Sequence, residues 1–134
     1  MSVIKSKRGE SDMEFIHTAR ELRIYTIQRC AHFPKKYTFY VGKPMADTVT
    51  EIHDSVKMAN SIYPTNPHEV QCRRDLMIRA NSLIQSLVSQ IEVAKELFGI
   101  DSDSIKFWME IVDKEDRLIK SVIKKDRERY KNIK

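Results

Sequence analysis

Hydrophobic residues recur along the chain in four long segments, at the three- and four-residue spacing of a helix that buries one face. Ser11 and Glu14 have the spacing of a capping box, and Pro34 disfavours a helical conformation at the residue before it. These signals predict a first helix over about residues 12–33. Its apolar stripe consists of Phe15, Ile16, Ala19, Leu22, Ile27, Cys30 and Phe33.

The second segment alternates steps of three and four residues, the spacing of a coiled-coil seam. It predicts a helix over about residues 37–63. Two starts are compatible with Gly42 and Pro44: the helix begins near Lys43 with Pro44 in its first turn, or it begins near Lys36 and bends. The seam consists of Met45, Val49, Ile52, Val56, Ala59 and Tyr63.

The third segment has clear start and stop signals. Asn66 is suited to the N-cap, Pro67 to the first helical position and Glu69 to the third, and Gly99 is suited to the end. We therefore predict a helix over about residues 66–98. Its seam consists of Val70, Arg73, Met77, Ala80, Ile84, Leu87, Ile91, Ala94 and Phe98.

The fourth segment follows the capping residues Asp101 to Ser104 and predicts a helix over about residues 102–130. Its seam consists of Ile105, Trp108, Val112, Glu115, Ile119 and Val122. Four long helices joined by short loops favour an all-α fold, an antiparallel up-down four-helix bundle. We expect one domain over residues 1–134, with residues 1–11 disordered. The chain has only 3 glycines and 4 prolines, fewer turn residues than a sheet protein of this size needs.

Two seams contain a charged residue, Glu115 on the fourth and Arg73 on the third. Glu115 lies in the middle of the fourth seam, and Arg20 and Arg23 lie near the middle of the first helix. In an antiparallel arrangement these midpoints face each other, so we hypothesise a buried Arg–Glu pair, which would select the register of the helices more than it stabilises them.

Arg73, on the third seam, has two interpretations. Its stem packs while its head reaches solvent, or it joins Arg74 and Arg79 in an exposed phosphate-binding cluster or subunit contact.

Patterns typical of enzymes are scarce. The sequence has no Gly-rich phosphate loop, no His-Glu-x-x-His motif and no Gly-x-Ser-x-Gly motif. A di-metal carboxylate centre in a bundle needs two Glu-x-x-His motifs, and the chain has one, Glu14 to His17. We therefore predict no catalytic residue, no metal site and no cofactor.

The location of the protein is predicted from what the sequence lacks. Cys30 and Cys72 have no metal-binding spacing and favour a reduced, cytoplasmic setting. The longest stretch without a charged residue, Ala80 to Ile91, is shorter than the roughly 20 residues that span a membrane. We therefore expect no transmembrane segment and no membrane partner. Residues 1–8 also lack the apolar stretch of a secretory signal, so we expect no such signal.

The net charge of +5 is concentrated at the two ends of the chain. Residues 1–36 carry a balance of +4 and residues 114–134 a balance of +5, whereas residues 37–113 carry −4. Clustered Lys and Arg attract phosphate backbones. The alternative is that these side chains complement a helix C-terminus and keep the protein soluble.

Three short motifs occur in a familiar order: Phe33-Pro34-Lys35 after the first helix, the aromatic-Gly turn Tyr40-Val41-Gly42, and Ala59-Asn60-Ser61-Ile62-Tyr63. Together with the helix lengths, they resemble the four-helix-bundle family of the accessory variability determinant of diversity-generating retroelements. This family is related to the intervening-sequence proteins of bacterial 23S ribosomal RNA genes. The resemblance covers about residues 12–125.

The resemblance implies a non-enzymatic accessory protein that forms a homo-oligomer, a ring-like pentamer. It also implies association with a reverse transcriptase and binding to RNA or DNA. The alternative is an orphan relative that acts as a protein–protein scaffold. No binding residue can be transferred by position, so the nucleic-acid-binding candidates are chosen by charge: Arg20, Arg23, Arg29, Arg73, Arg74, Arg79, Lys124, Lys125, Arg127 and Arg129.

Overall fold

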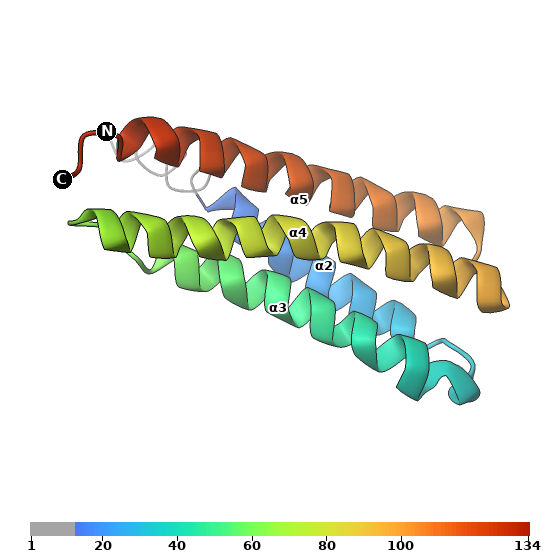
Figure 1. Cartoon of the computed structure of the whole chain (residues 1–134). Helices are drawn as coiled ribbons and strands as arrows, with labels where there is room; N and C mark the ends of the chain where they lie inside the picture. The colour runs from blue at the N-terminus through green and yellow to red at the C-terminus, as the bar shows by residue number, and fades with distance from the viewer. Residues whose placement is uncertain (1–12) are drawn as a thin grey trace.

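The computed structural model describes residues 13–134, which contain four long helices and no strand (Figure 1). The predicted disordered segment, residues 1–11, lies outside this range. The helices are α2 (Glu14–Cys30), α3 (Lys43–Asn60), α4 (Pro67–Phe98) and α5 (Ser102–Arg129). Two irregular turns, η1 (Lys35–Tyr37) and η2 (Thr38–Gly42), connect α2 to α3.

The predicted start of α4 is confirmed in atomic detail. The Asn66 Oδ1 accepts the backbone N–H of Glu69 at 3.0 Å, and Pro67 is the first helical residue. The Glu69 carboxylate in turn accepts the backbone N–H of Thr65 at 2.7 Å and its hydroxyl at 2.8 Å, which lowers the pKa of Glu69. Each bond satisfies a donor that the first turn of a helix leaves without a partner.

The connection between α4 and α5 also follows the predicted signals. Gly99 ends α4 with a φ of 76°, a conformation that favours glycine, and its N–H donates to the carbonyl of Lys95 at 3.0 Å. Asp101 caps α5, because its carboxylate accepts the backbone N–H of Ser104 at 2.9 Å. The same bond is the main reason that the pKa of Asp101 is lowered.

Both ends of α2 differ from the prediction. The helix begins at Glu14, and Met13 at its N-cap position makes no side-chain capping bond. Ser11, the predicted cap, lies outside the described residues, and Glu14 contacts the Lys114 Nζ at 3.2 Å instead. The helix ends at Cys30, ahead of the predicted end at Phe33, whose buried ring packs against Phe98 with the centroids 4.7 Å apart.

The start of α3 combines the two predicted alternatives. The backbone is already helical from Lys35, as the bent alternative requires, but regular α-helix begins at Lys43 with Pro44 in its first turn. Pro44 has no N–H to donate to the carbonyl four residues earlier. The wider π-helical turn η2 precedes it, and Gly42 keeps ordinary helical angles, with φ −65° and ψ −49°.

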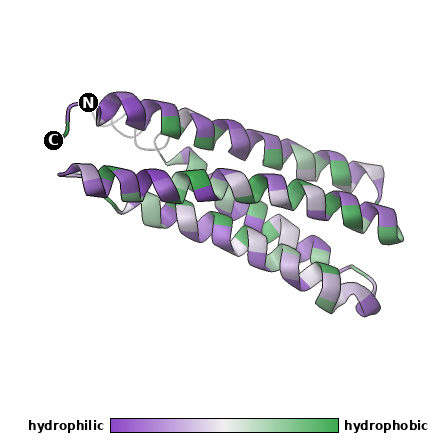
Figure 2. Cartoon of the chain, viewed as in Figure 1, coloured by the Kyte–Doolittle hydropathy of each residue, from purple (hydrophilic) through white to green (hydrophobic). Residues whose placement is uncertain are grey.

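The core lies between the helices, because α2 packs on α3 and α5, and α4 packs on the same two helices. Figure 2 shows that hydrophobic and hydrophilic positions alternate around every helix. None of the helices in residues 13–134 is both long and apolar enough to cross a membrane. The fully buried side chains include Leu22, Met45, Val49, Ile52, Val56, Met77, Ile84, Leu87, Trp108 and Ile119.

Two predicted core positions are wrong. Ile27 is 43% exposed, and its neighbour Thr26 is buried in its place, where its hydroxyl accepts the indole N–H of Trp108 at 2.9 Å. Tyr63 is 79% exposed because α3 ends at Asn60, so Tyr63 no longer follows the helical register. Apolar periodicity alone does not identify either change.

Candidate nucleic-acid interface

The strongest concentration of candidate side chains lies where the first turns of α4 meet the last turns of α5. These two segments lie side by side at the end of the molecule that carries the C-terminus (Figure 1). We call this region the α4–α5 basic end. It brings together Arg73, Arg74, Lys124, Lys125, Arg127 and Arg129 from the predicted set, and adds Lys131.

Arg73 is the member of this group that the sequence analysis misplaced. Its side chain is only 7% exposed, and its Nε and Nη2 contact the two carboxylate oxygens of Asp126 at 2.6 and 3.3 Å. Its Nη1 donates to the carbonyls of Ala59 at 3.0 Å and Ile62 at 3.3 Å. The head therefore does not reach solvent, and the exposed cluster of Arg73, Arg74 and Arg79 is not formed. Arg73 instead joins α4 to α5 and to the end of α3.

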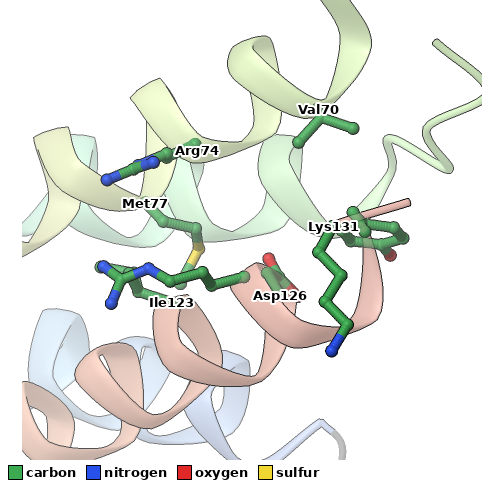
Figure 3. A pocket seen from close by; sticks show the side chains of 8 residues that line it. Val70, Arg74, Met77, Ile123, Asp126 and Lys131 are labelled. Atoms are coloured by element: carbon green, nitrogen blue, oxygen red, sulfur yellow. The ribbon is translucent and has the colours of Figure 1, made fainter. Parts of the chain in front are cut away.

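A pocket of about 250 Å³ opens between α4 and α5 at the α4–α5 basic end (Figure 3). Its lining combines apolar side chains with three cations and one carboxylate. Asp126 lines the pocket and also pairs with the buried Arg73, so one partner of this ion pair forms part of the pocket wall. The lining consists of Val70, Arg74, Met77, Ile123, Asp126, Arg127, Tyr130 and Lys131.

The cations of the pocket are only weakly compensated. Within the described residues, no carboxylate forms an ion pair with Arg74 or Arg127, and both side chains are exposed. Lys131 contacts Glu128 at 3.2 Å, but both side chains are more than half exposed, so this pair contributes little. The pocket rim therefore carries positive charge that is available to an anion.

The opposite side of α5 carries a second group of cations. Lys124, Lys125 and Arg129 line a shallow, open hollow together with Ser121 and Glu128. The Arg129 guanidinium lies 5.9 Å from the centroid of the Tyr130 ring and 4.0 Å from the Asp126 carboxylate. Basic side chains thus surround the end of α5 on two sides.

Two of the remaining candidates lie on α2 outside this region. Arg20 is exposed, and Arg23 donates from Nη1 to the His53 Nδ1 at 3.2 Å while lying 3.7 Å from the Asp54 carboxylate. Burial lowers the pKa of His53, and the positive charge of Arg23 lowers it further. Arg23 therefore connects α2 to α3 through these two contacts.

Arg29 and Arg79 are also engaged within the protein. Arg29 donates to the Ser104 hydroxyl at 2.8 Å, at the opposite end of α5 from the pocket. Arg79 contacts the Glu51 carboxylate at 2.7 Å, although both side chains remain more than half exposed. The ten predicted residues therefore do not form one surface.

Glu115 is buried as predicted, but its expected partner is wrong. It has no exposed surface, and neither carboxylate oxygen has a hydrogen-bond partner among the described residues. Arg23 contacts His53 and Asp54 instead, and Arg20 lies at the surface. Burial raises the pKa of Glu115 to about 9, so the side chain is a neutral acid at pH 7.

Within residues 13–134, no three His, Cys, Asp or Glu side chains are grouped so that they can hold a metal ion. Cys30 lies with its sulfur 3.8 Å from that of Met45, and burial raises its pKa to about 11. A thiol with so high a pKa is a poor nucleophile at neutral pH.

Comparison with known protein families, curated proteins and solved structures finds no match. Sequence reasoning missed the pocket because its lining combines two seam residues of α4, Val70 and Met77, with Ile123, which lies beside the seam of α5. Ile123, an apolar residue directly after the seam residue Val122, is the sequence signal that points to it.

Proposed function

We propose that this protein binds nucleic acid without catalysing a reaction, and that the α4–α5 basic end contacts the phosphates. The observation that carries the proposal is the position of Arg74 and Arg127, two exposed guanidinium groups without a carboxylate partner in the described residues, on either side of one pocket. Neutralising phosphates releases condensed counterions, and this release makes such binding favourable and sensitive to salt.

The proposal includes the finer arrangement of the helices, an antiparallel up-down four-helix bundle in a single domain. Contacts between α2 and α5 support it, since Glu14 at the start of α2 contacts Lys114, whereas Tyr25 near its end contacts Ser104 at the start of α5. This arrangement brings the first turns of α4 beside the last turns of α5, and so accounts for the concentration of charge.

The biological setting is proposed from the resemblance in the sequence. The protein would be a cytoplasmic accessory subunit that associates with a reverse transcriptase and RNA or DNA in a diversity-generating retroelement, as a homo-oligomer, a pentamer. Exposed aromatic side chains support an assembly, because Phe39 is 71% and Tyr40 is 77% exposed in the turn η2. Exposed aromatic groups of this kind are enriched at protein interfaces.

The phosphate-binding proposal is tested by measuring the affinity of a labelled DNA or RNA at several salt concentrations. Wild type should bind at low salt, and affinity should fall steeply as salt rises. The double variant Arg74→Gln and Arg127→Gln should bind more weakly, with a slope of log affinity against log salt reduced by about 2, one for each lost phosphate contact.

Matched controls remove exposed arginines elsewhere. The double variant Arg20→Gln and Arg79→Gln changes the net charge by the same amount but leaves the α4–α5 basic end intact. It should retain most of the affinity and the salt slope of wild type. Equal losses in both double variants would show that binding follows net charge alone, and would contradict an interface at the α4–α5 basic end.

The second candidate function is a protein–protein scaffold, and Phe39 and Tyr40 are the observation that favours it. Measuring assembly mass and nucleic-acid affinity on the same sample separates the two functions. An assembly that dissociates in the variant Phe39→Ser and Tyr40→Ser, combined with no nucleic-acid binding by wild type at low salt, would favour the scaffold.

A further inference from the structure

We infer that the pocket between α4 and α5 receives the base of one unpaired nucleotide, while Arg74, Arg127 and Lys131 hold the adjoining phosphates. The inference deepens the proposed function and rests on it, because it identifies single-stranded nucleic acid as the preferred ligand.

The size of the pocket selects a small group. Its volume of about 250 Å³ lies just below the roughly 300–1,000 Å³ of pockets that take drug-sized ligands. A base that is paired and stacked inside a duplex cannot enter such a pocket, and extruding it costs a few kcal/mol. An unpaired base enters without that cost, so the pocket discriminates between single and double strands.

The lining of the pocket suits a flat, largely apolar group. Val70, Ile123 and Tyr130 are partly exposed and provide apolar surface from both helices, whereas Met77 is part of the lining but fully buried. The Tyr130 ring already has the Arg73 guanidinium 5.8 Å and the Arg129 guanidinium 5.9 Å from its centroid. We therefore place the base against Val70 and Ile123, which are both partly exposed, where the guanidinium planes of the rim arginines can also stack on it.

The charges of the pocket determine which end of the nucleotide enters. Asp126 lies in the lining, and Figure 3 shows it with Met77 between Arg74 on one side and Lys131 on the other. A phosphate inside the pocket would meet this carboxylate, whereas the N–H groups of a base can donate to it. The phosphates therefore stay at the rim, where the available cations are located.

The same feature disfavours an acidic peptide, which is the other class of ligand that a basic rim attracts. An Asp or Glu side chain that enters the pocket would bring a carboxylate towards Asp126, and an ionised carboxylate has no proton to donate. A nucleotide combines a donor group for the interior with an anion for the rim. The arrangement of charges therefore favours the nucleotide.

The test compares a labelled oligothymidine strand of about 10 nucleotides, a length within the range of single-strand binding sites, with a duplex of equal length. The variant Val70→Trp fills the edge of the pocket without changing its charge. We expect it to lower the ratio of single-strand to duplex affinity about tenfold, because the filled pocket no longer allows one base to stack there. The control Val93→Trp places the same side chain on α4 at a position that is 50% exposed and outside the pocket, and should leave the ratio unchanged.

A second variant protects the test against misfolding. If circular dichroism shows that Val70→Trp is unfolded, Ile123→Phe replaces it, since Ile123 is only partly buried and lines the same pocket. In a competition arm, uridine monophosphate should displace the labelled strand at a lower concentration than inorganic phosphate does. Displacement by an oligoglutamate peptide at lower concentration than by the nucleotide would overturn the inference in favour of an acidic peptide.

The failure of the inference differs from the failure of the proposed function. If the ratio of single-strand to duplex affinity is the same in wild type and in the filled-pocket variant, the inference is overturned. If the Arg74→Gln and Arg127→Gln variant still weakens binding to both ligands, the proposed function stands. If wild type binds neither ligand at low salt, both are wrong.

Discussion

Arg73 and Asp126 form a two-contact ion pair between α4 and α5, with Nε 2.6 Å from Oδ2 and Nη2 3.3 Å from Oδ1. The side chains are 7% and 15% exposed, so the pair is largely shielded from water. Because Asp126 also lines the pocket, one interaction both holds the end of α5 in place and shapes the proposed binding site. Stability and binding are therefore linked at this point.

The first prediction concerns the removal of one partner of this pair. Asp126→Ala leaves the Arg73 guanidinium buried without its carboxylate, which should lower the free energy of unfolding by about 3 kcal/mol. Urea denaturation followed by circular dichroism measures the loss. The control Asp47→Ala removes the exposed pair with Lys43 and should cost less than about 1 kcal/mol. Similar losses in the two variants would show that burial of the Arg73 pair does not matter.

The second prediction concerns the effect of Glu115 on how the free energy of unfolding depends on pH. Its pKa is raised from 4.5 to about 9 in the folded protein, so the unfolded chain loses this proton at a lower pH than the folded chain does. The contribution of Glu115 to the free energy of unfolding is therefore fully present below about pH 4.5. It is lost as pH rises towards about 9, by about 1.4 kcal/mol per pH unit.

Glu115→Gln isolates this effect because the amide has nearly the same shape and does not titrate. The free energy of unfolding, measured in urea at about pH 6 and about pH 8, should fall more in wild type than in the variant. The difference between the two proteins is the quantity of interest, since other groups titrate in both. Parallel pH profiles would mean that Glu115 is paired or hydrated in solution.

The third prediction uses the bond between Trp108 and Thr26. Thr26→Val keeps the shape of the side chain but leaves the buried indole N–H without an acceptor, which should cost about 1–3 kcal/mol. Thr26→Ser keeps the hydroxyl and should retain more of the stability. Trp108 is the only tryptophan of the chain, so its fluorescence reports unfolding directly. A valine variant at least as stable as the serine variant would contradict the role of this bond.

The fourth prediction compares two glycines. Gly99 has a φ of 76° and a ψ of 143°, so Gly99→Ala should destabilise the protein by about 1–3 kcal/mol through backbone strain, although a Cβ there meets no atom within 4 Å. Gly42 is helical, and its Cβ would lie 3.8 Å from the Cys30 Cβ, an ordinary contact. Gly42→Ala should therefore stabilise the protein by about 0.5 kcal/mol. Thermal unfolding of the two variants checks the opposite signs.

Much of the helical organisation was predictable because its signals are local. Asn66 and Asp101 cap helices through atoms only three residues away, so their effect does not depend on the rest of the fold. The five seam residues from Met45 to Ala59 are buried as predicted, since a repeat of three and four residues identifies one face of a helix. The proposed bundle topology remains a prediction.

The irregular path between α2 and α3 was only partly predictable. Gly42 and Pro44 marked a disturbance, but both alternatives assumed a regular α-helix on one side of it. The observed π-helical turn η2 accompanies the burial of Val41 and Phe33 in the core. Propensity rules describe single residues and do not include this packing.

The sequence by itself determined four amphipathic helices, most of their ends, most of the buried positions, and a basic charge balance at residues 114–134. Only the tertiary structure decided that Arg73 binds Asp126, that Glu115 is buried with no hydrogen-bond partner among residues 13–134, and that Arg74 and Arg127 frame one pocket. The physical reason is that periodicity identifies which face of a helix is buried, whereas the partner of a side chain depends on which residue the neighbouring helix places opposite it.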